Sequence, residues 1–322
     1  MALANPAITT DAVRARLERG GTDVSGAVFK GLIGLSILVS LLVLGVLLVD
    51  VFRDGWTVLS TRPLDFLSGT LRSQAEEAGV FQGLRGTFWI GVFTVVLAFP
   101  IGIGAAVYLE EYAPASRVTR FITINIRNLA GVPSVVYGIL GFAIFVKTLA
   151  VVPDWVPGIG GNAFTGGRTT MAAGITLAVL VLPLVIITAS EAVRAVPDSI
   201  REAGFGVGAT RWEVVRSHVL PYAAPGIITG TILALARALG EAAPLILVGA
   251  VTGRLGQTGG LLDLGQLQER FTAMPIVITS WAGQPGEFQT QNAPAAIVVL
   301  LVVVLIANTA AILLRNRYEK KR

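Results

Sequence analysis

The run Gly31-Leu-Ile-Gly-Leu-Ser-Ile-Leu-Val-Ser-Leu-Leu-Val-Leu-Gly-Val-Leu-Leu-Val49 contains nineteen residues and no charge. An α-helix rises about 1.5 Å per residue, so about 20 apolar residues cross a hydrocarbon core roughly 30 Å thick. The run exceeds the apolar core of a cleaved signal peptide, about 7–15 residues, and no A-x-A-like site follows it. We therefore predict a transmembrane helix that is retained as a signal anchor.

Further apolar stretches of spanning length follow along the chain. They cover residues 86–109, 128–146, 169–190, about 222–251 and 288–314. Charged residues gather between them, which is the pattern of a multi-spanning protein. The predicted fold class is an all-α polytopic integral membrane protein with about six transmembrane helices.

The composition agrees with a membrane protein and excludes several other classes. Hydrophobic residues make up 53% of the chain and charged residues 14%, against roughly 25% charged in an average soluble domain. The net charge of +5 comes from Lys and Arg in short connecting loops, so it does not indicate nucleic-acid binding. The absence of cysteine excludes disulfides and thiolate sites, and the single histidine, His218, favours a packing or surface role over a metal ligand.

The distribution of basic residues predicts the orientation. An even number of spans places both ends of the chain and the loops after the second and fourth stretches on one side of the membrane. These segments contain sixteen Lys and Arg, whereas the loops on the other side contain eight. The positive-inside rule then places both termini in the cytoplasm. The expected layout is a cytoplasmic segment 1–28, a first transmembrane helix 29–52, an extracytoplasmic loop 53–85, a core of five helices 86–314 and a basic cytoplasmic tail 315–322.

The cytoplasmic loop 191–221 predicts a helical hairpin. Pro197 and Asp198 suit a helix start, Gly206 and Gly208 permit a turn, and Thr210 to Glu213 has the spacing of a capping box. We expect Pro221 to end the second helix. The expected apolar contacts are Ile200, Ala203, Trp212 and Val215. These residues alone leave open whether the hairpin lies on the bilayer surface or docks onto another protein.

The same loop resembles the EAA loop of ABC importer permeases. Glu202-Ala203-Gly204, then Gly208, then His218-Val219-Leu220-Pro221 keeps the spacing of that motif, with Gly204 in place of the second Ala and His218 in place of Ile. The resemblance implies that this loop seats a coupling helix on an ATP-hydrolysing subunit. The implied docking residues are Glu202, Ala203, Gly208, Leu220 and Pro221.

Arg237 and Glu241 interrupt the fifth apolar stretch, four residues apart, and on one helix they would share a face and pair. An Arg in the middle of a membrane costs roughly 2.5–3.5 kcal/mol, so it persists where it faces protein or water. A guanidinium suits phosphate-like oxygens, which favours a role in an anion pathway. A static ion pair that fixes helix packing is the alternative.

Two segments resemble phosphate ABC transporter permeases. The first is Arg237-Ala-Leu-Gly-Glu241-Ala-Ala-Pro-Leu, and the second is Asn128-Leu-Ala-Gly-Val-Pro-Ser-Val-Val-Tyr-Gly138. The resemblance implies that Arg237 and Glu241 act in phosphate passage. Ala130, Ser134 and Gly138 would form a small-residue stripe on one helix, so Arg127, Asn128 and Ser134 are candidates for either pathway or packing. Residues 271–318 are more similar to the PstA branch of this family than to the PstC branch.

The sequence contains no G-x-x-x-x-G-K-[ST] phosphate loop. We therefore expect no cofactor on this chain, no enzymatic activity of its own, and ATP-Mg on a partner ATPase. The resemblance implies a PstC-like permease partner in a heterodimer, two copies of a PstB-like ATPase, and a PstS-like phosphate-binding protein, within membrane lipid and without nucleic acid. The alternatives are an ABC permease for sulfate or molybdate, a stand-alone secondary anion transporter, and, least supported, a membrane-embedded enzyme.

Overall fold

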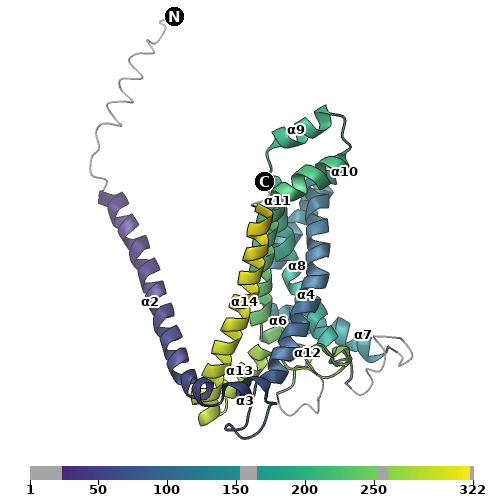
Figure 1. Ribbon diagram of the computed structural model, residues 1–322. Coiled ribbons are helices and arrows are strands. Elements are labelled where there is room, and N and C mark those ends of the chain that lie inside the picture. The colour runs from purple at the N-terminus through teal and green to yellow at the C-terminus, as the bar shows by residue number, and fades with distance from the viewer. Residues whose placement is uncertain (1–23, 153–164, 253–259, 320–322) are drawn as a thin grey trace, which may run out of the picture. The chain divides into compact units, whose positions relative to one another are not determined.

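The computed structural model describes residues 24–152, 165–252 and 260–319, which are helical and contain no β-strand (Figure 1). The expected N-terminal segment lies outside the described residues up to position 23, and so do positions 320–322 of the tail. The α-helices are α2 (Val24–Thr61), α3 (Pro63–Ser68), α4 (Phe81–Val107), α5 (Arg117–Ala130), α6 (Ser134–Gly141), α7 (Lys147–Ala150), α8 (Thr170–Arg194), α9 (Asp198–Gly206), α10 (Arg211–Val214), α11 (Leu220–Gly240), α12 (Ala243–Val248), α13 (Met274–Ala282) and α14 (Ala293–Glu319). Short π-helical turns extend several of them.

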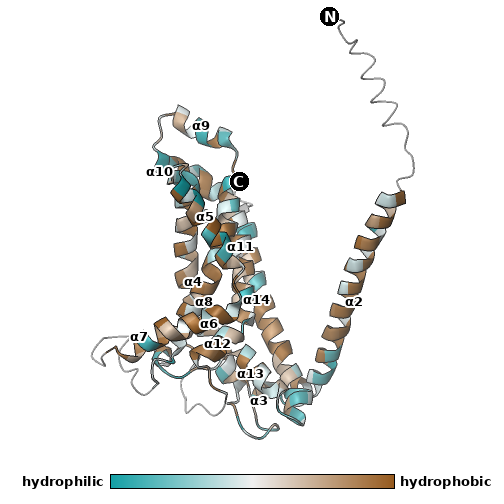
Figure 2. Ribbon diagram, turned by 180° about the vertical axis from the view of Figure 1, so that it is seen from behind, coloured by the Kyte–Doolittle hydropathy of each residue, from teal (hydrophilic) through white to brown (hydrophobic). Residues whose placement is uncertain are grey.

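The helices of spanning length match the predicted class. Within the described residues, five continuous helical stretches are long and apolar enough to cross a membrane: Val24–Thr61, Phe81–Tyr112, Thr170–Arg194, Arg211–Gly240 and Phe288–Arg317. A sixth span results if the bent pair Arg117–Ala130 and Ser134–Ala150 counts as one. Apolar residues cover the middle lengths of α4, α8 and α14 (Figure 2). The prediction of an all-α polytopic protein with about six spans is confirmed.

The chain divides into two compact units, Met1–Val51 and Phe52–Arg322. The described part of the first unit is the beginning of α2, and its large apolar side chains, from Val24 to Val49, are exposed all round in this single chain. A helix that is apolar on every side needs lipid or protein around it. Helix α2 starts before the predicted span 29–52 and continues beyond it to Thr61.

In the second unit, α4 and α8 form the centre of the core, and α6, α11 and α12 pack against them. Small residues bring these helices close together. A Cβ on Gly102 of α4 would lie 2.7 Å from Cγ1 of Val185 on α8, and a Cβ on Gly174 of α8 would lie 2.4 Å from Cβ of Phe93 on α4. Close backbone approach through small residues is how helices associate inside membranes.

The predicted third span is not one straight helix. Helix α5 starts at Arg117, eleven residues before the predicted start at residue 128, and α5 and α6 meet at a bend of 101°. Pro133, at φ −55° and ψ 137°, disfavours helical geometry at Val132 and has no N–H to continue the helix. The predicted stripe of Ala130, Ser134 and Gly138 on one helix is therefore wrong, because Ala130 ends α5 and Ser134 begins α6.

The predicted fifth span also differs. Helix α11 ends at Gly240, Glu241 has an extended backbone with ψ 115°, and the separate helix α12 follows. Pro221 does not end the second loop helix, because α10 continues through the π-helical turn Val215–Val219 into α11. Pro221 lies inside this continuous helical stretch, two residues after the π-helical turn, and the helix accommodates its missing N–H.

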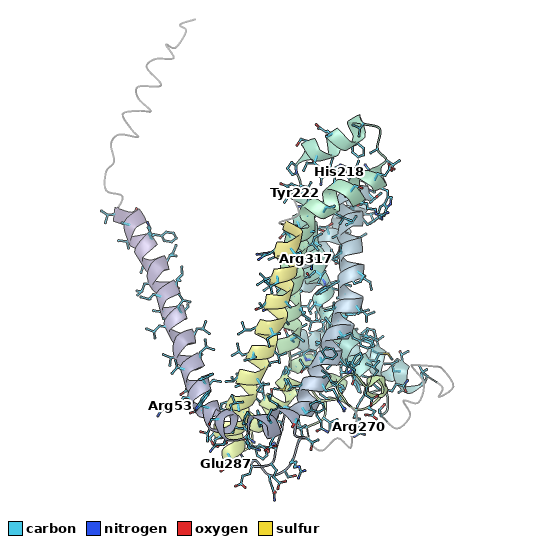
Figure 3. All side chains as sticks on the ribbon, in the orientation of Figure 1. Arg53, His218, Tyr222, Arg270, Glu287 and Arg317 are labelled. Carbon is cyan, nitrogen blue, oxygen red and sulfur yellow. The ribbon has the colours of Figure 1, made fainter. Side chains whose placement is uncertain are left out.

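The second unit has two polar ends. His218 and Tyr222 lie at the end that carries α9 and α10, and Arg270 and Glu287 lie at the opposite end with α3 and α13 (Figure 3). Helices α4, α8, α11 and α14 run between these ends. The loop 191–221 and the loop 62–80 are thus on opposite faces of the apolar core.

Candidate functional site

Arg237 lies in the last turn of α11, next to the break between α11 and α12. Its Nε lies 3.4 Å from Oε1 of Glu241, so the predicted pair is formed. The Arg237 side chain is 46% exposed in this chain, whereas that of Glu241 is 19% exposed. The guanidinium carries five N–H donors, and its contact with Glu241 is made by Nε. It therefore still has donors to offer an anion.

The two phosphate-permease-like segments meet in the structure. A Cβ on Gly138 of α6 would lie 2.7 Å from Cα of Pro244 on α12, so the two backbones are in direct contact. Tyr137 is buried on α6 beside Gly138. Its hydroxyl donates to the carbonyl oxygen of Leu129 on α5 at 2.8 Å, which bridges the bend. Tyr137 thus joins α5 to the part of α6 that packs on α12, a role that sequence reasoning missed.

The other candidates around the bend differ in their placement. Arg127 and Asn128 are exposed near the end of α5, and Ser134 is half-buried at the start of α6. Because the bend separates α5 from α6, the structure places Arg127 and Asn128 on a different helix from Ser134. Gly138 contacts Pro244 and Leu247 of α12, and Arg127 and Asn128 lie on the other side of the bend.

The hairpin 197–214 forms as predicted in its main features. Pro197 caps α9, Gly208 has φ +84°, and Thr210 and Glu213 form a complete capping box. A Cβ on Gly204 would lie 2.7 Å from Cγ2 of Val214, so glycine allows α9 to pack on α10. This close approach gives a physical reason for glycine at the position where the EAA motif has its second Ala.

The expected apolar contacts of the hairpin are only partly correct. Val215 is buried and Ile200 is half-buried, but Trp212 and Ala203 are exposed, because the neighbouring Val214 faces the core instead. Among the predicted docking residues, Glu202, Ala203, Gly208 and Pro221 are exposed and Leu220 is half-buried.

The hairpin also exposes three large apolar side chains, Phe205, Val207 and Trp212, which were not predicted as a group. Their apolar side chains on both sides of the glycine turn were the signal that could have identified them.

Two ion pairs connect the base of the hairpin to the end of α4. Arg201 Nη2 lies 2.8 Å from Oε1 of Glu111, with 18% and 9% of the side chains exposed. Arg194 at the end of α8 pairs with Glu110 at 2.7 Å. Arg201 also donates to the carbonyl oxygens of Val193 and Val196. These contacts join α9 to the end of α4 and to the last turn of α8.

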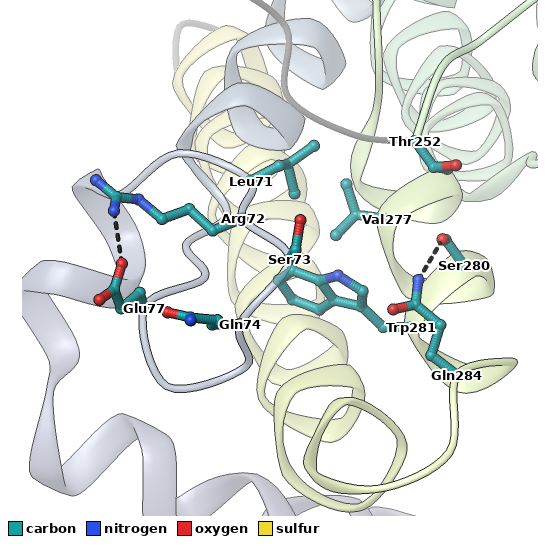
Figure 4. Close-up of a pocket in the computed structure, with 10 residues that line it drawn as sticks. All are labelled: Leu71, Arg72, Ser73, Gln74, Glu77, Thr252, Val277, Ser280, Trp281 and Gln284. Carbon is teal, nitrogen blue, oxygen red and sulfur yellow. Dashed lines mark hydrogen bonds and ion pairs between the residues drawn. The ribbon is translucent and has the colours of Figure 1, made fainter.

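A polar pocket of about 490 Å³ lies at the opposite end, between loop 71–77 and α13 (Figure 4). Arg72 and Glu77 form an ion pair at its rim, and Ser280 accepts from Gln284 across from them. Trp281, which is buried, forms part of its wall. The sequence of loop 53–85 gave no signal for this pocket. In the described part of the chain, no group of three or more His, Asp or Glu side chains is placed to hold a metal ion.

Residues 98–322 match the family described as "Binding-protein-dependent transport system inner membrane component". The chain belongs to this family. It is therefore a multi-pass membrane permease subunit of an ABC-type importer, and the predicted membership in the ABC importer permeases is confirmed.

Characterised relatives carry the names of phosphate transport permeases. The chain is 38% identical to PstA 1 of Mycobacterium tuberculosis over 200 residues, which cover 62% of this chain and 58% of that protein. It is 31% identical to PstC of Mesorhizobium japonicum over 230 residues, covering 68% of this chain and 70% of the relative. It is 33% identical to PstC 2 of Mycobacterium tuberculosis, covering 70% and 74%. The chain thus spans less than two thirds of PstA 1.

Two solved ABC transporter structures share the fold. A bacterial ABC transporter that imports the acidic polysaccharide alginate is similar with a TM-score of 0.53 at 14% identity, covering 97% of this chain and 99% of that chain. The MetNI methionine ABC transporter in an inward-facing conformation has a TM-score of 0.50 at 20% identity, covering 74% and 94%. At these identities the likeness establishes the fold alone.

Proposed function

We propose that this chain is one of two permease subunits of an ATP-driven importer of inorganic phosphate. The support comes from relatives named as phosphate permeases and from one observation in the structure: a half-exposed guanidinium at the break of a spanning helix. Arg237 lies seventeen residues beyond the start of α11 at Leu220, about 25 Å along the helix at about 1.5 Å per residue.

A charged Arg at such a depth is stable only where it faces water or another protein. Its exposed side chain therefore belongs at an interface that a second subunit and the translocated anion complete. The break after Gly240 leaves Glu241 on a non-helical backbone, so the pair can separate without unwinding α11. Glu241 holds the guanidinium when no anion is present, and a phosphate oxygen replaces it when substrate enters. The second subunit is a PstC-like permease in a heterodimer.

The energy comes from two copies of a PstB-like ATPase, which carry the ATP-Mg. Exposed Phe205, Val207 and Trp212 around the glycine turn are the anchors of the docking surface, since buried aromatic residues carry much of the energy of protein interfaces. The ion pair between Arg201 and Glu111 passes the motion of the hairpin to α4. The hairpin end and both termini lie in the cytoplasm. A PstS-like binding protein delivers phosphate at the opposite end, which carries the polar pocket at Arg72 and Glu77.

The test is uptake of radioactive phosphate by the complete complex in proteoliposomes. Arg237→Gln is expected to abolish ATP-dependent uptake, while Arg237→Lys keeps a fraction of it, because a point charge replaces the bidentate fork. Co-purification with the second permease and the ATPase should be unchanged in both variants. Normal uptake by Arg237→Gln would remove Arg237 from the pathway.

Two controls separate the alternatives. Excess sulfate or molybdate should not compete with phosphate; competition by either would indicate a permease for that oxyanion. Vesicles without ATP should show no uptake. Full phosphate transport by the purified chain alone, without nucleotide, would indicate a secondary transporter and would overturn the proposal.

A further inference from the structure

Helix α5 carries a row of positive charge that the fold leaves uncovered. With 3.6 residues per turn, Arg117, Arg120, Arg127 and Asn128 fall within about 100° of arc around the helix. All four are exposed, and no residue of α5 is buried. We call these four residues the basic face.

The remaining sides of α5 have a different character. Thr119, Thr123, Ile126 and Ala130 are half-buried on the side that packs against α8. Val118, Ile122 and Leu129 form a third, apolar side that is exposed in this chain. An exposed apolar side suits lipid or an apolar protein surface, but the basic face does not.

The arginines of the basic face are not neutralised within the described structure. The ion pairs of the described residues involve Arg72, Arg194, Arg201 and Arg237, and none involves Arg117, Arg120 or Arg127. Of the nearby carboxylates, Glu110 and Glu111 are bound to Arg194 and Arg201, and Glu191, which lines the same small cavity as Arg127, forms no ion pair in the described structure. Arg117 and Arg120 therefore remain available to an anion from outside the described part of this chain, whereas Arg127 shares its surroundings with Glu191.

The basic face leads away from the Arg237 site. Gly138 of α6 contacts Pro244, which lies three residues beyond Glu241, and its neighbour Tyr137 donates to the carbonyl oxygen of Leu129, which follows Asn128 directly in α5. From there the basic face extends to Arg117, ten residues from Arg127 and about 15 Å along the helix. The N-terminal end of α5 is the hairpin end, since Arg211 of α10 stacks on Tyr112, five residues before Arg117.

We propose that the basic face of α5 forms the cytoplasmic half of the phosphate path, along which the anion passes from Arg237 to Arg127, Arg120 and Arg117. The proposal rests on the proposed function, because it assumes that the cargo is an oxyanion. Several weak sites in a row let an anion leave its strongest site without facing bare hydrocarbon. The shared chemistry, a phosphate oxygen on guanidinium, would also fit a lipid headgroup, and the experiment separates the two sources.

The chain contains no cysteine, so single cysteines can report on each side of α5. Ile124 lies in the middle of the basic face and Ile122 on the apolar side; they are 47% and 42% exposed. Ile124→Cys and Ile122→Cys form a matched pair that keeps every arginine. The probe is a membrane-impermeant, anionic thiosulfonate reagent, applied from the cytoplasmic side to the complete complex with cysteine-free partner subunits.

The reagent is expected to modify Ile124→Cys and not Ile122→Cys, and inorganic phosphate should slow the modification. Arg120→Gln should lower ATP-dependent phosphate uptake roughly tenfold, as expected for one lost hydrogen bond to a charged group, equally in vesicles of neutral and of anionic lipid. Arg317→Gln, a basic residue on α14 at the same end, should transport normally.

Modification of both cysteines alike, or no protection by phosphate, would overturn the proposal. An effect of Arg120→Gln that follows the lipid charge would assign the basic face to headgroups instead. These outcomes can be distinguished from a failure of the proposed function. A wild-type complex that fails to take up phosphate refutes that function, whereas a transporting complex with an unreactive Ile124→Cys refutes only the role of the basic face.

Discussion

Gly208 shows how one residue determines the shape of the hairpin. Its φ of +84° is disfavoured for residues with a Cβ, although the space around it is open. Gly208→Ala should therefore strain the turn by about 1–2 kcal/mol and weaken binding of the ATPase roughly tenfold, since 1.4 kcal/mol is about one decade of affinity. The measurement is the affinity of the purified ATPase for the permease complex in detergent.

Gly206 provides the matched control, because its Cβ would also meet open space and its φ is not positive. Gly206→Ala should bind the ATPase as tightly as the wild type. Equal weakening by both substitutions would show that the loss of flexibility, rather than the left-handed turn, is responsible.

The pairing of Arg237 with Glu241 illustrates what single residues reveal in a sequence. The spacing of four predicted the contact, and the contact is present at 3.4 Å. The reason given was wrong, because α11 ends at Gly240 and the two residues are not on one helix. An extended Glu241 can still reach back to the last turn, and Gly240 and Pro244 are the local sequence signal that the helix is interrupted here.

At the scale of helices, the contact between α6 and α12 joins the two phosphate-permease-like segments. A Cβ on Gly138 would lie 2.7 Å from Cα of Pro244 and 2.8 Å from Cδ1 of Leu247. Gly138→Ala should cost about 1–3 kcal/mol through overpacking, push α6 away from α12 next to Arg237 and Glu241, and lower uptake. Thermal unfolding of the purified complex and phosphate uptake measure the two effects.

Gly104 of α4 is the control, since nothing lies within 4 Å of its would-be Cβ. Gly104→Ala should leave stability unchanged or raise it by about 0.5–1 kcal/mol, the usual gain for Ala over Gly inside a helix. A stable, fully active Gly138→Ala complex would contradict the close contact between α6 and α12.

The ion pair between Arg201 and Glu111 connects two elements and carries a separate prediction. Glu111→Gln removes the buried charged partner of a mostly buried guanidinium, leaves it only the exposed Asp198, and should destabilise the base of the hairpin by about 1–3 kcal/mol. ATPase binding should persist while uptake per ATP hydrolysed falls, because the hairpin no longer moves α4. Glu77→Gln, in the exposed pair with Arg72, should change stability by at most about 1 kcal/mol. Unchanged coupling in Glu111→Gln would show that α9 acts through another contact.

Proline explains why the helix breaks were harder to predict than the spans. Pro100, Pro183 and Pro225 lie inside α4, α8 and α11, which continue through them. Pro133 ends a helix, and here Gly131 and the packing of Gly138 on Pro244 favour the bend. The apolar runs predicted the spans because a membrane sets their length, but tertiary contacts decide whether a proline is accommodated or bends the chain.

At the scale of the whole molecule, this chain exposes surfaces that lipid, water or a partner protein must cover. The apolar side chains of α2 before Phe52, the apolar side of α5 and the half-exposed Arg237 each require a different environment. Lipid suits the first two, whereas Arg237 requires water or protein. The sequence alone indicated which environment α2 and Arg237 require. It did not do so for α5, because the helix there was predicted to start at residue 128. The arginines before that position were assigned to a loop.

The orientation of the second unit in the membrane gives the last prediction. The proposed topology puts α9 in the cytoplasm and the rim of the polar pocket outside, and each carries one exposed serine, Ser199 and Ser73. Because the chain has no cysteine, Ser73→Cys and Ser199→Cys each introduce the single thiol that a maleimide can label in this chain. Each substitution replaces one oxygen atom by sulfur. In intact cells, an impermeant maleimide should label Ser73→Cys at once and label Ser199→Cys only after the membrane is opened. The reverse order would place the hairpin outside, where no ATPase can reach it, and would refute both the positive-inside argument and the docking role together.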